Sequence, residues 1–169
     1  KVVAYEGITA GDKDFSALIA KLQKENVDFV YYGGYHPELG LILRQAGEKG
    51  LKAKFMGPEG VGNSSISAIA GKASEGLLVT LPRSFDQDPK NQALVQAFKD
   101  KKQDASGPFV FPSYAAVQVI AEGIEKAGDE KPEDVAKALR SNTFNTPTGE
   151  LSFDEKGDLK NFKFVVYEW

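Results

Sequence analysis

The sequence predicts an α/β fold in which helices wind about a parallel sheet on both sides, a doubly wound parallel sheet. Three observations carry this prediction. Apolar strand-like runs alternate with helical patterns through residues 1–82, and the connections between them are short. The run Phe29–Tyr32 is apolar throughout instead of alternating, which is typical of a strand buried on both faces.

The first elements in chain order are a strand and a helix. Val2–Tyr5 is predicted to be a strand, followed by a loop over residues 7–11. Asp12 or Asp14 can cap the helix that comes next. The apolar residues of that helix recur at intervals of three and four, which predicts one buried face: Phe15, Leu18, Ile19 and Leu22.

A strand–helix–strand unit occupies residues 28–60. Its first strand, Phe29–Tyr32, is closed by two glycines, and Pro37 suits the first turn of a helix because a proline there loses no hydrogen bond. The helix has apolar residues at helical spacing and ends near Gly50, and Lys54–Gly57 begins the second strand. The two strands are expected to be parallel, with a right-handed crossover.

Two polar side chains follow the strands of this unit. Tyr35 comes just after the first strand and Glu59 just after the second. Ligands of open α/β sheets bind at the carboxyl ends of the strands. A tyrosine and a carboxylate at that edge could receive a small cation, although the residues alone equally allow a packed ring and an exposed loop acid.

The pattern changes after Pro82. A short helix near residues 66–70 and a strand over Gly76–Leu81 complete the first part. Residues 83–160 are predicted to be mostly helical, with a β-hairpin over Thr148–Lys160 around the turn DEKGD, and residues 161–169 to be a returning strand. We therefore divide the chain into segments 1–82, 83–160 and 161–169.

The helical segment offers almost no sheet for its helices to cover. One long helix is predicted to carry an apolar stripe made of Val110, Tyr114, Val117, Ala121 and Ile124. This stripe and the nearby Phe109 need a partner surface that the chain barely supplies. We expect a companion segment, N-terminal to this one, to complete the sheets.

Composition excludes several classes of function. The 21 Lys and Arg against 24 Asp and Glu give a formal charge of -3, which argues against a nucleic-acid partner. Absence of Cys rules out disulfides, thiol nucleophiles and thiolate metal sites. No apolar run approaches the length of a membrane span, and the chain opens at Lys1 without a visible signal peptide.

Three features that resemble reactive sites are better explained otherwise. His36 is the only histidine, and beside Pro37 it is interpreted as a helix-entry residue instead of a catalytic base. The run GPEGVG at residues 57–62 matches neither nucleotide-binding glycine pattern, so we interpret it as a turn that needs positive φ. The run DEKGD lacks the ligand spacing of a calcium loop. No metal or cofactor is predicted.

Several long motifs carry a resemblance to a known family. They are, in chain order, YYGGYHPE, FMGPEGVGN, AIAG, SEGLLVT, the Asp-Pro-Lys-Asn run, FVFPSYAAV and SFDEKGDLKNF. Together they span nearly the whole chain, which resembles the branched-chain amino-acid (Leu/Ile/Val) substrate-binding proteins of ABC transporters, the pseudomonad-type members in particular. The resemblance implies a type I periplasmic binding protein with two doubly wound lobes, of which this chain is the second half.

The resemblance also implies a site and partners. Tyr35 and Glu59 match the residues that hold the α-amino group of the ligand, and Phe109 matches an aromatic residue of the side-chain pocket. The carboxylate-binding groups would belong to the missing N-terminal half. The chain is then expected to be a periplasmic transport protein and not an enzyme, with a small amino acid and the membrane subunits of an ABC permease as partners and with no cofactor.

Alternatives remain open from the sequence. The same scaffold could bind another small zwitterion such as γ-aminobutyrate, including as a fragment of a sensor. A signalling receptor's ligand-binding module would share the architecture. An α/β hydrolase or dehydrogenase is disfavoured because nucleophile and nucleotide motifs are missing.

Overall fold

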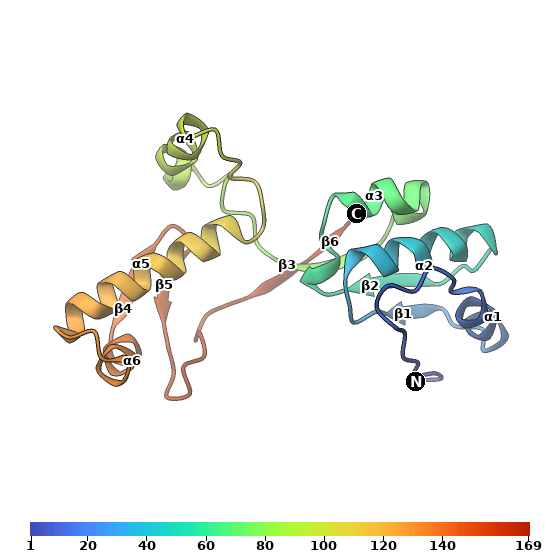
Figure 1. Cartoon of the computed structure of the whole chain (residues 1–169), viewed down its shortest axis with the longest axis horizontal. Helices are drawn as coiled ribbons and strands as arrows, with labels where there is room; N and C mark the ends of the chain where they lie inside the picture. Colours follow the sequence, from blue (N-terminus) through green and yellow to red (C-terminus); the bar gives the residue numbers. More distant parts are fainter. The chain divides into compact units, whose positions relative to one another are not determined.

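The computed structural model describes all 169 residues, which form two compact units (Figure 1). Unit 1 comprises Lys1–Leu81 and Val165–Trp169, and unit 2 comprises Pro82–Phe164. The chain passes between the units at 81–82 and again at 164–165. Each unit is described by itself.

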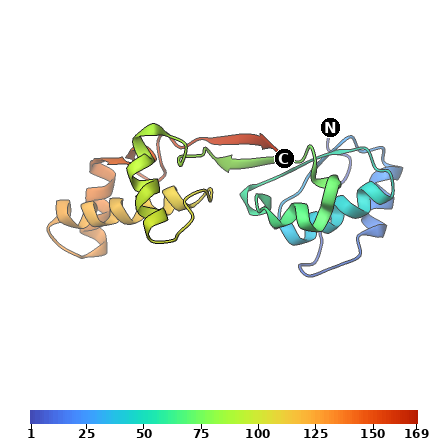
Figure 2. The same ribbon diagram turned by 90° about the horizontal axis from the view of Figure 1, so that it is seen from above.

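Unit 1 is built on a sheet with the order β1-β2-β3-β6. Strands β1 (Phe29–Tyr31), β2 (Lys54–Gly57) and β3 (Leu78–Pro82) pair in parallel, with Tyr31 opposite Met56. Strand β6 (Phe164–Glu168) lies beside β3 (Figure 2), and the backbone N–H of Trp169 donates to the carbonyl of Leu77 over 2.8 Å. The predicted α/β fold with a parallel sheet is confirmed.

Three helices of unit 1 share one hydrophobic core with the sheet. They are α1 (Ser16–Lys24), α2 (His36–Glu48) and α3 (Ser65–Ala70); the 3₁₀ turn η1 (Glu59–Val61) precedes α3, and η2 (Gly71–Ser74) follows it. The core comprises Phe15, Ile19, Leu39, Ile42, Leu43, Ala46, Phe55, Val61, Ile66, Ala70, Leu77 and Val79. The stripe predicted for α1 is therefore buried as expected, and Asp14 Oδ1 accepts a hydrogen bond from the backbone of Ser16 at the helix start.

The opposite face of the sheet is open at β1. Val30 packs against the core, whereas Phe29 is 45% and Tyr31 62% exposed. The prediction that this strand is buried on both faces is wrong for this chain. The reason is that α1, α2 and α3 all contribute to the same core, so they cover only the Val30 side.

Val2–Tyr5 was expected to be a strand, and this prediction is also wrong. The segment forms no ladder, and Val2 and Tyr5 are largely exposed. β1 is an edge strand that pairs only with β2, so its other side has free backbone groups, but Val2–Tyr5 does not pair with them. The segment is instead anchored further along, where the Gly11 N–H donates to Glu38 Oε1 and the Phe15 N–H donates to Gln45 Oε1.

Unit 2 is mostly helical. It contains η3 (Pro89–Asn91), α4 (Gln92–Asp100), α5 (Val110–Ala127) and α6 (Pro132–Ser141), followed by β4 (Thr143–Thr146) and β5 (Gly149–Ser152). A small core is made by Phe85, Val95, Ala105 and Phe111. Asp88 caps η3 by accepting from the backbone of Lys90, which places the helix start where Asp88-Pro89 predicts it.

Unit 2 has its main hairpin upstream of the predicted turn DEKGD, which closes a second, shorter hairpin. The main antiparallel ladder runs from Thr143 opposite Ser152 to Thr146 opposite Gly149, upstream of the predicted turn. The tight turn is Pro147–Thr148, and Gly149, the first residue of β5, has φ of +114°, which a side chain would strain. The run DEKGD also forms a turn, closed by the bridge between Phe153 and Leu159 and by the hydrogen bond from the Lys160 N–H to the Ser152 carbonyl over 3.0 Å.

Helix α5 is apolar on two faces. The buried residues are Phe111, Ala115, Val119 and Gly123, one set of i+4 steps. The predicted core stripe lies on another face, where Tyr114 and Val117 are exposed, as is the neighbouring Ile120. The sequence pattern identified an apolar face correctly, but within this chain a different one is buried.

Candidate functional site

Tyr35 and Glu59 lie at one edge of the sheet of unit 1. Strands β1 and β2 run in parallel and in register, and the Tyr32 N–H extends their pairing by donating to the Met56 carbonyl over 2.8 Å. Tyr35 follows β1 as the N-cap residue of α2, and Glu59 follows β2 as the first residue of η1. Both side chains are exposed to solvent, and the exposed fraction of Tyr35 is 71%.

The loops that carry these residues are in contact. A Cβ built on Gly60 would lie 3.1 Å from Cδ1 of the Tyr35 ring and 2.9 Å from the carbonyl oxygen of Gly34. The Tyr35 ring therefore rests against the residue that directly follows Glu59. This edge presents an aromatic ring with a hydroxyl next to a carboxylate-bearing turn, a combination that can pair with a cation.

The glycines of GPEGVG are present for a different reason from the one predicted. None of Gly57, Gly60 and Gly62 has positive φ. Each is instead closely approached: a Cβ would meet Val61 at Gly57, Gly34 and Tyr35 at Gly60, and Leu81 at Gly62. The prediction of a turn that needs positive φ is wrong, because these positions need space and not a left-handed backbone.

Two ionisable side chains near Tyr35 are already engaged. Hydrogen bonding from the Gly11 backbone lowers the pKa of the Glu38 carboxyl. Burial raises the pKa of Tyr32, the charge of Glu38 raises it further, and a hydrogen bond with the Tyr35 backbone acts in the opposite direction. Tyr32 and Glu38 thus support the first turn of α2 around Tyr35.

Phe109, the third predicted site residue, belongs to unit 2. It is the N-cap residue of α5, its carbonyl accepts from the Ser113 N–H over 2.9 Å, and its ring is 46% exposed. The exposed ring leaves Phe109 available to a ligand or another part of the protein. Its participation in one site with Tyr35 and Glu59 stays a prediction.

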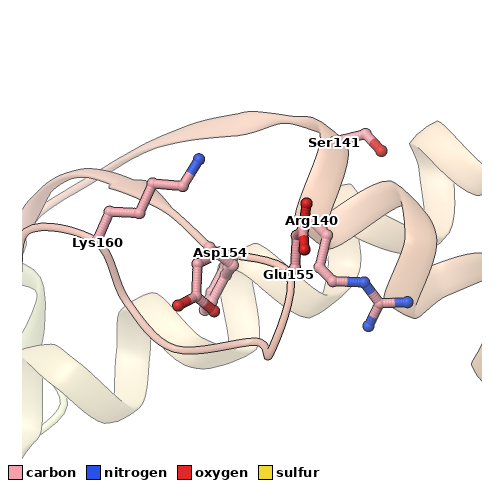
Figure 3. A pocket seen from close by; sticks show the side chains of 6 residues that line it. Arg140, Ser141, Asp154, Glu155 and Lys160 are labelled. Atoms are coloured by element: carbon pink, nitrogen blue, oxygen red, sulfur yellow. The ribbon is translucent and has the colours of Figure 1, made fainter.

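A shallow depression on unit 2 makes a poor ligand site. It lies where the end of α6 meets the turn after β5, and Arg140, Asp154 and Lys160 are among its lining residues (Figure 3). Asp154 Oδ1 accepts from the backbones of Lys156 and Asp158, so this carboxylate shapes the turn. No group of three or more acidic or histidine side chains could hold a metal ion, and none of the helices has the length and apolarity to cross a bilayer.

A parallel α/β sheet with polar side chains after the carboxyl ends of its strands has the architecture of the open α/β sheets, whose ligands bind at that edge. The chain belongs to the periplasmic binding protein family, whose model matches residues 1–169. This membership confirms the family and the fold that the sequence motifs imply.

Known relatives agree with this family. The chain is 71% identical over 169 residues to the leucine-, isoleucine-, valine-, threonine- and alanine-binding protein of Pseudomonas aeruginosa, covering 100% of the chain and 45% of the relative. It is 58% identical over 168 residues to the leucine-specific-binding protein of Salmonella typhimurium, covering 99% of the chain and 46% of the relative. The chain thus spans about half the length of these relatives.

A solved structure has the same fold. The crystal structure of a leucine-binding protein from Thermotoga maritima aligns with a TM-score of 0.82 at 30% identity, covering 96% of this chain and 47% of that one. The fold of this chain, with its parallel sheet and its helical segment, therefore also occurs in that leucine-binding protein.

Proposed function

We propose that this chain forms part of a periplasmic transport protein that binds a small amino acid, a leucine, isoleucine or valine, and delivers it to an ABC permease. The observation that carries the proposal is the placement of Tyr35 against the Glu59 turn at the carboxyl edge of the sheet. The relatives, all named as amino-acid-binding proteins, supply the ligand class. Capture involves no bond making, so no enzymatic activity is proposed.

The chemistry of the pair suits an α-ammonium group. Removing an ammonium from water is costly unless it is paired and hydrogen-bonded. Glu59 supplies the opposite charge, and Tyr35 supplies a ring face or a hydroxyl. Phe109 is proposed to line the pocket for the aliphatic side chain, because its exposed ring has the size and apolarity for that contact.

The remaining groups of the site are proposed to lie in the part of the protein outside this chain. The chain corresponds to only 45% of its Pseudomonas relative. Two apolar faces, one at Phe29 and Tyr31 in unit 1 and one at Tyr114 and Val117 in unit 2, are open in the chain by itself. Large exposed apolar patches mark interfaces. We propose that residues N-terminal to this chain cover both faces and bind the ligand's carboxylate.

γ-Aminobutyrate is a less suitable ligand. It would place its ammonium group at Glu59, but its longer spacing would strain the contact with the groups that hold the carboxylate. The relatives are named for α-amino acids, which favours an α-amino acid here.

Calorimetry on the full-length protein tests this function. The wild type is expected to bind leucine more tightly than γ-aminobutyrate, and Glu59→Ala is expected to weaken leucine binding at least ~100-fold, because truncating one member of a desolvated charge pair costs about 2–5 kcal/mol. Glu75→Ala is the control, since Glu75 is an exposed acid on the same unit with no role in the site. An unchanged dissociation constant for Glu59→Ala would refute the assignment of the ammonium site.

A further inference from the structure

Gly60 has no room for a side chain on the Tyr35 side. A Cβ there would lie 2.9 Å from the Gly34 carbonyl oxygen, where ordinary van der Waals contact begins at 3.4 Å. The obstacle is backbone, so it cannot be relieved by a rotamer change. A Cβ would also lie 3.1 Å from the Tyr35 ring. Any side chain at Gly60 must push the Tyr35 loop and the Glu59 turn apart by several tenths of an ångström.

Tyr32 holds the same loop from the other side. Its ring folds back over Gly34, where a Cβ would lie 2.6 Å from Cζ of Tyr32. Its hydroxyl group lies over the Gly34 backbone, where a Cβ would also meet it, and its ring packs against the core of unit 1. Tyr32 therefore ties Tyr35 to the rigid part of the unit.

We propose that Gly60 and Tyr32 are positioning residues of the ammonium site: Gly60 is the surface on which the Tyr35 ring rests, and Tyr32 anchors the Tyr35 backbone. This inference rests on the proposed function, and it explains how an exposed tyrosine is held beside Glu59. Neither residue needs to touch the ligand. Tyr32 acts through Tyr35, and Gly60 acts through the spacing between the Tyr35 loop and the Glu59 turn.

The expected effect follows from the sensitivity of a site to small displacements. Binding constellations must be held within about 0.5 Å of their productive geometry. Gly60→Ala exceeds the free space and is expected to weaken leucine binding ~10-fold. Tyr32→Phe keeps the ring packing but removes the hydroxyl that lies over Gly34, and is expected to weaken binding about 3-fold to 10-fold because the Tyr35 loop is then held less closely.

The experiment compares these variants in the full-length protein with Gly33→Ala as a matched control. Gly33 lies in the same loop, has no positive φ, and a Cβ on it meets nothing within 4 Å. Leucine affinity by calorimetry should fall for Gly60→Ala and Tyr32→Phe and stay at the wild-type value for Gly33→Ala. Thermal unfolding of each variant shows whether it is folded. If Gly60→Ala does not fold, Tyr32→Phe decides the question.

A double-mutant cycle separates positioning from a general structural effect. In the Tyr35→Ala background, Tyr32→Phe should change leucine affinity less than about 2-fold, because the group it positions is gone. Gly60→Ala should lose less affinity there than in the wild type, and the loss that remains comes from the Gly34 backbone, which still displaces the Glu59 turn. Equal losses in both backgrounds would overturn the proposal, as would wild-type affinity for both single variants.

Failure of the proposed function is recognisable separately. If the wild-type protein binds no leucine, the function is wrong. The positioning role is then read from crystal structures of wild type and Gly60→Ala, in which the Tyr35 ring should move away from residue 60. An unmoved ring would overturn the positioning role on its own.

Discussion

At the scale of single residues, the carboxylates around Tyr35 have different tasks. Glu38 Oε1 accepts the Gly11 N–H over 2.9 Å and so fastens the N-terminal segment to the first turn of α2. Glu59 is exposed on the turn beside the Tyr35 ring. Glu38 therefore organises the loop, and Glu59 is left as the acid that can meet a ligand.

The Glu38 contact should depend on pH. The hydrogen bond lowers the carboxyl pKa below its ordinary value of 4.5, so the ionised form is favoured in the folded state. Its contribution is complete above the unfolded pKa and is lost as the pH falls through the lower folded pKa. We expect the Gly11 amide shift in NMR to titrate with a midpoint below 4.5 and this titration to vanish in Glu38→Gln.

The amide of Gly50 is a control for that titration. It donates to a backbone carbonyl, that of Gly47, and should not follow the Glu38 carboxyl. A Gly11 amide that is insensitive to pH in the wild type would contradict the contact.

Phe109 allows a prediction about ligand size. If its ring lines the side-chain pocket, Phe109→Ala should weaken leucine binding by about 1–3 kcal/mol and alanine binding by much less, because alanine has no aliphatic chain to reach the ring. Calorimetry with both amino acids on the full-length protein checks this. Similar losses for the two ligands would count against Phe109 as a pocket wall.

The placement of Tyr35 and Glu59 at one edge could be predicted because a general rule applied. Tyr35 and Glu59 were assigned to one edge because parallel strands have their carboxyl ends together, and the structure places them so. The supporting roles of Gly60 and Tyr32 could not be predicted, since they depend on distances between loops that are 25 residues or so apart in sequence. The closely spaced glycines of GPEGVG were the one sequence signal for these roles. Such glycines indicate close approach of another part of the chain to the backbone as readily as they indicate a turn.

At the scale of secondary-structure elements, helical periodicity was more informative than strand composition. The α2 pattern and its Pro37 start are reproduced in a helix over His36–Glu48. Val2–Tyr5 has strand composition but no strand partner, and Phe29–Tyr31 is a strand without cover on one face. Whether a strand pairs or is covered depends on neighbouring layers, which the local sequence does not encode.

Two glycines of α2 should respond oppositely to alanine. A Cβ on the buried Gly40 would lie 2.8 Å from Cγ2 and 2.9 Å from Cβ of Ile69 on α3, whereas on the exposed Gly47 it would be 3.4 Å from Ala73. Gly40→Ala is expected to destabilise the protein by about 1–3 kcal/mol through overpacking. Gly47→Ala is expected to stabilise it by up to about 1 kcal/mol through helix propensity.

Chemical denaturation of the full-length protein measures both effects. The pair is internally controlled because the two positions share a helix and the same substitution. If Gly40→Ala also stabilises the protein, the close α2–α3 approach is not a constraint on the fold.

At the scale of the whole molecule, the open apolar faces connect fold to function. A parallel sheet is ordinarily covered on both faces, and a helix that is apolar on two sides is ordinarily buried on both. The sheet of unit 1 is uncovered on one face at β1, and helix α5 of unit 2 has one apolar face exposed, so each departs from its expectation. The relatives are about twice as long as this chain, so they contain enough additional residues to cover such faces.

The α5 face provides the test of that completion. Val117 is 70% exposed in this chain, yet we expect the full-length protein to bury it. Val117→Lys should then lower the free energy of unfolding of the full-length protein by about 3 kcal/mol or more, because it removes apolar burial and places an unpaired charge in an interface. Glu125→Lys is the matched control on the same helix, at an exposed polar position, with an expected effect within about 0.5 kcal/mol. Denaturant unfolding of both variants gives the comparison. Equal small effects on the free energy of unfolding would mean that Val117 is exposed to solvent in the full-length protein.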